Sequence, residues 1–269
     1  MKKMTVMLGL LLVLAFTVSP ASAIMDGEPD TEHTNVGAIM MVWPQFDDIT
    51  GRLCSATLIH ERALLTAAHC HTYIENQGIG YNQVWVTFDQ DPFADDAQHL
   101  EVEDFIVHPD FGTGQGAHDI ALVILAEPVV GIEPEALPAI GYMNDRIKVL
   151  NGKGRRGLDL IIVGYGTLQP ILVVPDIGLD ATRNTGTVSF KQLLPFEIIS
   201  SQNSNLGDAH TTMGDSGGPL FHVDRQGNEV LVGLLARTSG SGWVGPLMFH
   251  YRVDTAIARD FIEANLPQD

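Results

Sequence analysis

The sequence reads Gly214-Asp215-Ser216-Gly217-Gly218-Pro219-Leu220 in the last quarter of its 269 residues. Glycine has no Cβ, so the backbone around Ser216 can turn sharply and a bound molecule can approach it closely. Ser216 is therefore a candidate nucleophile. Taken alone, the segment is also compatible with an ordinary glycine-rich turn.

Two other segments carry the side chains that a reactive serine needs. One reads Leu64-Leu65-Thr66-Ala67-Ala68-His69-Cys70 and puts a histidine at the end of a small-residue turn. The other reads Asp119-Ile120-Ala121-Leu122-Val123-Ile124-Leu125 and puts an aspartate at the head of a buried strand. A serine hydroxyl needs a base within hydrogen-bond reach, and histidine, with a pKa near neutrality, is the usual one. Each segment also has an ordinary interpretation, as a satisfied histidine or a capping aspartate.

Together these segments resemble the trypsin/chymotrypsin family of serine peptidases, over nearly the whole chain after residue 23. The order histidine, aspartate, serine is the order of this family, whereas subtilisin-like enzymes and α/β-hydrolases use other orders. Four further segments resemble family segments: Cys54-Ser55-Ala56-Thr57-Leu58-Ile59, Val107-His108-Pro109-Asp110-Phe111, Val163-Gly164-Tyr165-Gly166-Thr167 (with Tyr165 in place of Trp) and Tyr251-Arg252-Val253. With a single possible disulfide, the chain is most similar to bacterial-type secreted members.

Short apolar runs separated by Gly, Pro, Asn and Asp predict an all-β fold, either a sandwich or a barrel set. Such runs occupy 36–43, 84–88, 120–125, 160–165, 187–190, 230–236 and 248–253. The family resemblance implies two six-stranded antiparallel Greek-key barrels of the chymotrypsin kind, 24–142 and 143–269, with a polar linker near 144–159. A C-terminal helix is expected after Asp254 or Thr255, because Ile257, Phe261, Ile262 and Leu266 fall on one face before Pro267.

The resemblance implies a role for each candidate residue. Ser216 would attack the scissile carbonyl, His69 would carry its proton to the leaving amine, and Asp119 would fix the imidazole tautomer, as in the family's triad. The N–H groups of Gly214 and Ser216 would form the oxyanion hole. The sequence therefore predicts a serine endopeptidase that forms an acyl-enzyme. The alternatives are a catalytically silent binding module of the same fold, or an exported hydrolase of another fold.

Residues 1–23 predict a secretory signal peptide. Lys2 and Lys3 precede an apolar run over 4–18, and residues 19–23 end in an A-x-A-like cleavage pattern. The alternative, a membrane anchor, usually needs roughly twenty apolar residues, and this run has about fifteen. We therefore expect a secreted protein, extracellular or periplasmic, with no membrane attachment after cleavage.

The predicted cleavage makes Ile24 the first residue of the mature chain. Ile24-Met25-Asp26-Gly27 resembles the family's N-terminal Ile-Val-Gly-Gly, although Met25 and Asp26 depart from that pattern. In the family, the new α-ammonium pairs with the aspartate before the catalytic serine, which here is Asp215. Signal cleavage would then produce the active N-terminus directly; the alternative is that the coincidence of cleavage site and insert is accidental.

Charge and cysteine content limit the partners. The chain has 15 basic and 33 acidic residues, and loss of Lys2 and Lys3 takes the net charge from −18 to about −20. Such a surface repels nucleic acid and anionic lipid, so the expected partner is a protein or peptide substrate, and the chain is expected to be a monomer. Cys54 and Cys70 in an exported chain indicate a disulfide, with two free thiols as the alternative.

Substrate preference is where the sequence departs most from the family. His210 lies six residues before Ser216, where members that cleave after arginine or lysine carry an aspartate. The candidate pocket residues are His210, Thr211, Arg237 and Thr238, with Met248 narrowing the pocket. This set predicts poor cleavage after Arg or Lys. Two possibilities remain open: a narrow pocket for small or medium side chains, or one whose donors bind an acidic side chain.

We expect no metal or cofactor. His69-Cys70-His71 offers ligands two residues apart with no second cluster, which is unlike a zinc site. The acidic loop over 89–96 falls where some family members bind calcium, and oxygen-rich loops suit Ca²⁺. The family's glutamate ligands are not matched there, so a solvated loop is expected. The alternative is calcium at Asp89, Asp91, Asp95 and Asp96.

Overall fold

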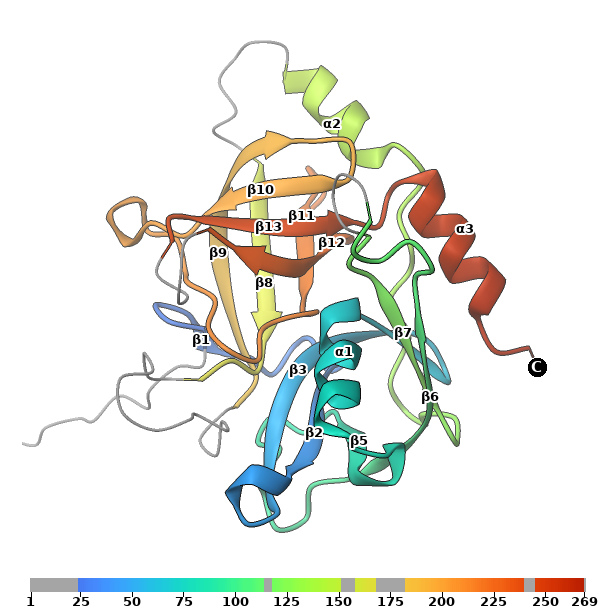
Figure 1. The fold of residues 1–269 in the computed structure, drawn as a ribbon. Coiled ribbons are helices and arrows are strands. Elements are labelled where there is room, and N and C mark those ends of the chain that lie inside the picture. The colour runs from blue at the N-terminus through green and yellow to red at the C-terminus, as the bar shows by residue number, and fades with distance from the viewer. Residues whose placement is uncertain (1–23, 114–117, 151–157, 168–181, 240–244, 269) are drawn as a thin grey trace, which may run out of the picture.

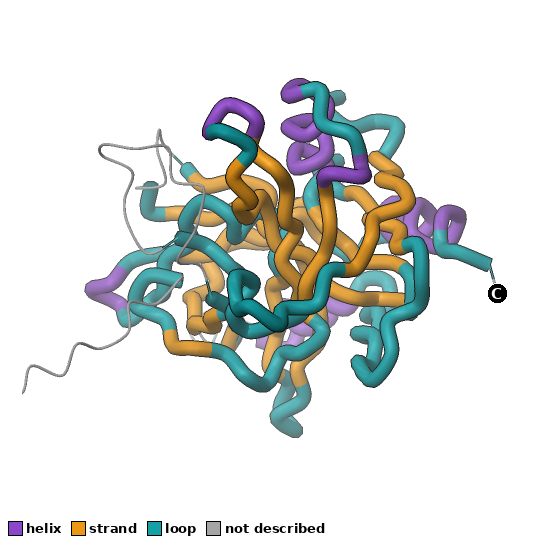
Figure 2. The backbone as a smooth tube through the Cα atoms, turned by 90° about the horizontal axis from the view of Figure 1, so that it is seen from below, coloured by secondary structure: helices purple, strands orange, loops and turns teal. Residues whose placement is uncertain are grey.

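The structure is a computed structural model that describes residues 24–113, 118–150, 158–167, 182–239 and 245–268. Two barrels of antiparallel strands dominate it, one above the other in Figure 1. The tube in Figure 2 shows the strands in the middle of the molecule and the helices around them. The predicted architecture of two six-stranded chymotrypsin-like barrels is confirmed.

The first barrel closes in the order β2-β3-β4-β7-β6-β5. Its strands are β2 (Val36–Trp43), β3 (Ile49–His60), β4 (Ala63–Thr66), β5 (Val84–Thr87), β6 (Leu100–Val107) and β7 (Ala121–Leu125). All five residues of β7 are apolar and buried, as expected for a strand at the centre of a core. β7 pairs with β4 in the register Leu64↔Val123, and this pairing fixes the position of the residues just before β7 relative to the end of β4.

The second barrel closes because β8 pairs with both β9 and β11. Its strands are β8 (Asp159–Gly164), β9 (Asn184–Leu193), β10 (Glu197–Ser201), β11 (Pro219–Val223), β12 (Glu229–Thr238) and β13 (Leu247–Arg252), and the short β1 (Glu28–Pro29) adds to the edge of β9. One buried cluster fills this barrel. The larger cluster fills the first barrel and continues through Tyr165, Phe221 and Tyr251, so the barrels share an apolar interface.

The described residues contain three α-helices: α1 (Ala68–Gln77), α2 (Tyr142–Leu150) and α3 (Ala256–Asn265). Short 3₁₀ turns also occur at η1 (Pro44–Phe46), η2 (Tyr81–Gln83) and η3 (Ser204–Leu206). α2 occupies the first part of the segment expected to be a linker, because apolar residues interrupt its polar sequence and Met143 is buried. Residues 151–157 of that segment lie outside the described residues.

The C-terminal helix is confirmed, with one correction to its buried face. The Thr255 hydroxyl caps it by accepting a hydrogen bond from the Ala258 amide at 3.2 Å. Phe261 and Ile262 are buried as predicted, but Ile257 is 40% exposed, and Ala258 takes its place against the core. Among the described residues, no helix combines the length and the apolar character needed to cross a bilayer.

Candidate active site

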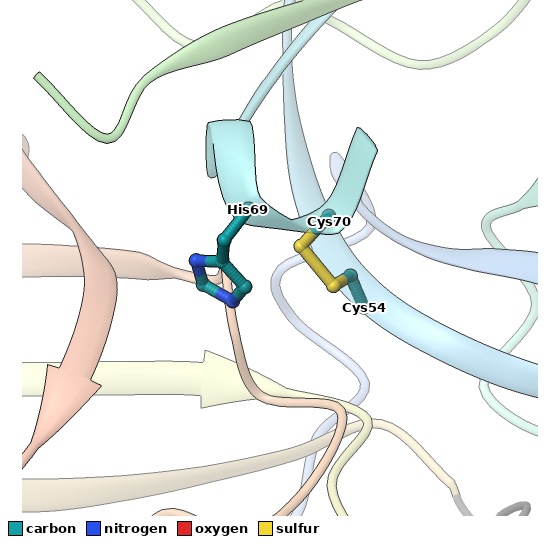
Figure 3. Close-up of side chains that lie close together, drawn as sticks. All are labelled: Cys54, His69 and Cys70. Carbon is teal, nitrogen blue, oxygen red and sulfur yellow. A yellow bond between two sulfur atoms is a disulfide. The ribbon is translucent and has the colours of Figure 1, made fainter. Parts of the chain in front are cut away.

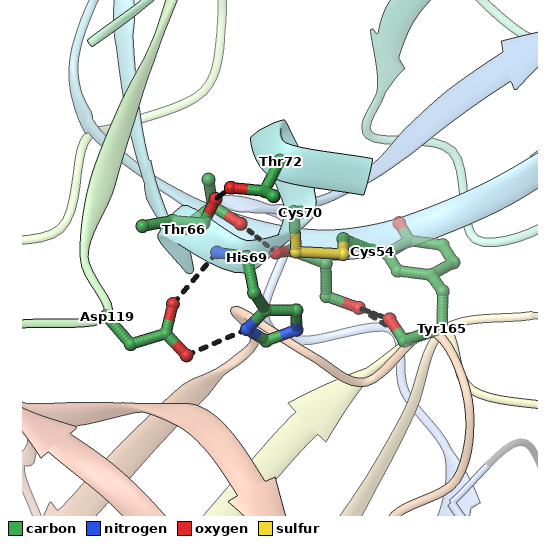
Figure 4. The surroundings of a disulfide bond; sticks show 10 residues. Cys54, Thr66, His69, Cys70, Thr72, Asp119 and Tyr165 are labelled. Carbon is green, nitrogen blue, oxygen red and sulfur yellow. Dashed lines mark hydrogen bonds and ion pairs between the residues drawn. A yellow bond between two sulfur atoms is a disulfide. The ribbon is translucent and has the colours of Figure 1, made fainter. Parts of the chain in front are cut away.

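His69 lies in the first turn of α1, at the edge of the first barrel. The helix begins directly after Ala67, which has an extended backbone, so the expected small-residue turn is in fact a strand-to-helix junction. The His69 amide donates to Asp119 Oδ1 at 2.9 Å, and His69 Nδ1 lies 2.7 Å from Asp119 Oδ2 (Figure 4). Figure 3 shows the imidazole leaving this turn beside the disulfide.

Asp119 lies just before β7 and is 7% exposed. The Ile120 amide donates to the His118 carbonyl at 2.8 Å, closing a tight turn around Asp119, and His118 has a positive φ of 44°. This turn points the carboxylate at α1, where both of its oxygens face nitrogen atoms of His69. A carboxylate only accepts hydrogen bonds, so the imidazole proton must be on Nδ1. In the neutral imidazole Nε2 then carries the lone pair.

Ser216 belongs to the loop between η3 and β11 and is 7% exposed. A cavity of about 160 Å³ contains Ser216, Gly214 and His69 in its wall, and β2, β3 and α1 meet one loop of the second barrel there. The other lining residues are Trp43, Arg52, Leu53, Cys54, Cys70, Tyr73 and Met213. The structure therefore brings together, around one cavity, the histidine and serine that the sequence places 147 positions apart.

The serine loop is attached to β3 of the first barrel. The Ser55 amide donates to the Ser216 carbonyl at 2.8 Å, and the Ser55 hydroxyl donates to the Gly214 carbonyl at 2.8 Å. Gly217 has φ 78°, and a Cβ there would overlap the Thr66 hydroxyl, so only glycine fits. Sequence reasoning missed Ser55, although its place beside Cys54 in a conspicuous segment was a usable signal.

Asp215 is buried within this loop, and its carboxylate is held by the backbone of the second barrel. The amides of Gly166 and Thr212 donate to its two oxygens, each at 2.7 Å. Burial raises the pKa of Asp215 to about 7, although the Thr212 amide, the charge of Arg52 and the Gly166 amide all act to lower it. Desolvation thus outweighs the local partners when Ile24 is in peptide linkage with residue 23.

The segment that begins at Ile24 lies in the second barrel. Ile24 is fully buried, and its side chain packs near Gly186 in β9. Met25 and His210 exchange backbone hydrogen bonds of 3.0 and 2.9 Å. The segment therefore reaches the loop that leads to Ser216 through His210. The predicted pairing of the Ile24 α-ammonium with Asp215 stays a prediction.

The candidate specificity residues all have partners within the chain. His210 Nε2 lies 2.8 Å from the Ser204 hydroxyl and 4.0 Å from Asp26 Oδ2. Arg237 forms an ion pair of 2.7 Å with Glu197 and lies over the ring of Phe249.

The remaining candidate pocket residues, Thr211 and Thr238, lie in a loop and in β12. The Thr211 hydroxyl donates to Gln202 Oε1 at 3.3 Å, and Thr238 pairs with the fully buried Met248 across β12 and β13. Residues 240–244, which connect these two strands, lie outside the described residues. The substrate preference stays a prediction.

Cys54 and Cys70 form a disulfide, so the alternative of two free thiols is wrong. Their sulfurs and His69 lie within 4.8 Å of one another, but sulfurs in a disulfide provide no thiolate for a metal. His71 faces the Tyr81 hydroxyl at 2.9 Å instead. The His69-Cys70-His71 sequence therefore has a structural explanation that needs no ion.

In the acidic loop, two of the carboxylates named as possible calcium ligands bond to their own chain. Asp89 accepts from the Gln98 amide at 2.7 Å, and Asp91 accepts from the Phe93 amide at 2.9 Å. The loop is also tied to the second barrel, because the Tyr165 hydroxyl lies 2.9 Å from the Asp89 carbonyl oxygen. Calcium binding at Asp89, Asp91, Asp95 and Asp96 stays untested.

Comparison with known proteins gives one family. The model of the family described as Trypsin matches residues 37–255. The chain is 24% identical to the venom peptide isomerase heavy chain of Agelenopsis aperta over 216 residues, which cover 71% of this chain and 79% of the relative.

Two further relatives are longer proteins. One is the suppressor of tumorigenicity 14 protein homolog of Bos taurus, 27% identical over 80% of this chain and 25% of the relative. The other is the inactive CLIP domain-containing serine protease A28 of Anopheles gambiae, 28% identical over 71% of this chain and 50% of the relative. The chain thus spans half or less of the length of these two.

Proposed function

Because the chain belongs to the trypsin family, we propose that it is an active serine endopeptidase whose triad is His69, Asp119 and Ser216. The observation that carries the proposal is the pairing of His69 with Asp119 in the wall of the cavity that also contains Ser216. The family alone does not decide activity, since one similar protein is named as inactive.

The proposed reaction begins with proton transfer. With its Nδ1 proton engaged by Asp119, His69 offers the Nε2 lone pair to the Ser216 hydroxyl. The Ser216 oxygen bonds to the scissile carbonyl carbon, and the carbonyl electron pair moves to the oxygen. His69 then donates the proton to the leaving amine as the C–N bond breaks. Water repeats the sequence on the acyl-enzyme and releases the acid.

The negative oxygen of the tetrahedral intermediate needs donors that are already in place. We assign this role to the N–H groups of Gly214 and Ser216. Two contacts support the assignment: the Gly214 carbonyl is held by Ser55, and the Ser216 carbonyl is held by the Ser55 amide. Fixing both carbonyls restricts the rotation of the peptide units around Ser216. Loss of one such donor typically costs about 2.7–4 kcal/mol of barrier.

The test is a burst assay with an activated ester on the purified chain lacking residues 1–23. We expect a burst of one product per active site, which is absent in Ser216→Ala and strongly reduced in His69→Ala. A phosphonylating reagent should label Ser216, and a chelator should leave the chemical step unchanged. A folded protein without burst or labelling would instead be the silent binding module, and loss of activity with chelator alone would contradict the triad.

We further propose that the protein is secreted and that signal cleavage exposes Ile24 as the active N-terminus. The burial of Ile24 and the Met25–His210 pairing support this, because the chain end would lie inside the second barrel near the Ser216 loop. N-terminal sequencing of the secreted, active protein should begin at Ile24. A start elsewhere would contradict direct activation.

For substrate preference we propose poor cleavage after Arg or Lys. A substrate cation left without a counter-charge in a closed pocket would cost several kcal/mol, and His210 stands at the position of the family's pocket aspartate. A peptide library compared between wild type and His210→Ala separates the two remaining possibilities. An acidic preference that requires His210 supports the donor pocket, an Ala or Val preference independent of it supports the narrow pocket, and a strong Arg or Lys preference contradicts both.

A further inference from the structure

Arg52 is a charged residue in the interior of the molecule. It lies on β3 of the first barrel, opposite Met40 of β2, and is 2% exposed. Arginine is almost never this deeply buried unless the charge has a role or a partner. Its side chain reaches out of the first barrel into the wall of the cavity that contains His69, Gly214 and Ser216.

The Arg52 side chain packs directly on Gly214. A Cβ built on Gly214 would overlap Nη1 and Cζ of Arg52, so the guanidinium occupies the space that any other residue would need. Gly214 also has φ 94°, a backbone conformation that side chains disfavour. The Ser55 hydroxyl holds the Gly214 carbonyl at 2.8 Å. The position of the Gly214 peptide is therefore set by two residues of β3.

The charge of Arg52 acts on the next residue, Asp215. This carboxylate is buried and accepts two backbone amides, from Gly166 and Thr212. Amide hydrogen bonds alone do not offset the desolvation of an anion, and a buried charge without an opposite charge is strongly destabilising. Arg52 supplies positive charge to Asp215, and this lowers the cost of ionising it.

We propose that Arg52 is a positioning residue for the oxyanion loop, holding Gly214 by packing and Asp215 by charge. The assignment rests on the proposed function for its catalytic meaning, since it concerns the loop that would bind the oxyanion. This role of Arg52 differs from the proposed pairing of Asp215 with the Ile24 α-ammonium, because Arg52 is part of the folded first barrel whether or not a free N-terminus exists. The loop would then be partly ordered before signal cleavage.

The groups that face Asp215 can be named for the design of the test. Arg52 comes from β3, and the Thr212 hydroxyl lies 3.3 Å from Asp215 Oδ2. His69 from α1 is a second titratable group in the wall of the same cavity. Loss of the cation would raise the pKa of Asp215, and the experiment must separate this effect from any effect on His69.

The test compares Arg52→Met, which keeps an unbranched apolar side chain but removes the charged guanidinium, with Arg52→Lys, which keeps the charge. The first measurement is the pH dependence of kcat/KM in the mature protein. An opposite charge nearby typically shifts a carboxyl pKa by about 1–3 units. We expect the acid limb of Arg52→Met to move up by about one pH unit with KM nearly unchanged, and the limb of Arg52→Lys to stay near wild type.

The second measurement needs no activity and uses Ser216→Ala chains that begin at residue 23, in which Ile24 has no α-ammonium. The free energy of unfolding is followed between pH 4 and pH 9. Stability should decline as the pH rises in this range, because buried Asp215 keeps its proton in the folded state and releases it in the unfolded state. In Arg52→Met the decline should continue about one pH unit further, so that the folded-to-unfolded ratio loses about tenfold more than wild type between pH 4 and pH 9.

The third chain carries Arg52→Met together with Asp215→Asn, and separates Asp215 from His69. The extra decline should disappear there, because no carboxyl remains to titrate. A decline that persists would arise from His69 and would overturn the proposal, as would an unchanged midpoint in Arg52→Met. If the mature chains that keep Ser216 show no turnover, the proposed function fails, and the stability curves of the Ser216→Ala chains still decide the role of Arg52.

Discussion

Replacement of Asp215 by asparagine should flatten the dependence of stability on pH. The chain to use begins at residue 23 and carries Ser216→Ala, which leaves no α-ammonium at Ile24 and prevents self-digestion. Burial raises the pKa of Asp215 from the ordinary 3.8 to about 7. In this range the folded protein keeps a proton that the unfolded chain releases, so stability should fall as the pH rises and level off above about 7.

The size of the effect follows from the shift. A difference of about three pKa units corresponds to about 4 kcal/mol, at 1.36 kcal/mol per unit. We therefore expect the parent chain to lose about 4 kcal/mol more than Asp215→Asn between pH 4 and pH 8. The absolute stability of Asp215→Asn is a poor readout, because its amide nitrogen would face one of the Gly166 and Thr212 amides that now donate to the carboxylate.

Urea unfolding followed by tryptophan fluorescence, at half-unit pH intervals, provides the measurement. All other carboxyl groups are common to both chains, so their titration cancels in the difference. Parallel curves for the two chains would refute the reasoning, because Asp215 would then titrate alike in the folded and unfolded states. A chain that begins at Ile24 should show a smaller decline, since its α-ammonium would lower the pKa of Asp215.

Three further predictions concern stability and the serine loop. The disulfide closes a loop between two residues that are 16 positions apart. Its loss in Cys54→Ser/Cys70→Ser should therefore lower the free energy of unfolding by about 3 kcal/mol in urea titrations. His33 lies 2.8 Å from Asp30 and 2.6 Å from Glu229; burial opposes its charge, but these two carboxylates raise its pKa. His33→Gln should therefore cost about 1–2 kcal/mol at pH 5.5, and the difference should shrink as the pH rises above 6.5 through the raised pKa; a pH-independent difference would count against the charged state. Gly214→Ala places a methyl group on Arg52, so the ester burst should disappear while far-UV circular dichroism stays near wild type.

The segments with strong local signals were predicted well from the sequence. β2 begins and ends at the predicted residues, 36 and 43, because a run of apolar residues between turns has few other interpretations. β12 extends beyond the predicted run at both ends, since pairing with β11 and β13 includes the charged residues Glu229 and Arg237, which carry no strand signal of their own. α2 was missed because glycines just beyond it dominate the composition of that segment.

The residues of the candidate site also differ in how far local sequence signals predict them. His69, Asp119 and Ser216 could be predicted as a triad because each lies in a motif with its own local pattern. The pocket residues have no such pattern, and their partners come from distant segments. Arg237 pairs with Glu197, 40 positions away, and His210 faces Ser204 and Asp26. A count back from Ser216 gives the position of His210 in a family alignment, but it does not give the direction of its side chain.

The attachment of the serine loop to β3 has a consequence for the division into two barrels. Arg52, Ser55 and Thr66 belong to the first barrel, yet all three contact the loop that carries Ser216 in the second. The Thr66 hydroxyl donates to the Ser55 carbonyl at 2.9 Å, which links β4 to the same contact. A separated second barrel would lose these contacts and leave Asp215 without the charge of Arg52. The conformation of the loop that carries Ser216 therefore depends on both barrels, and β3 contributes to the candidate site as directly as the helix that carries His69.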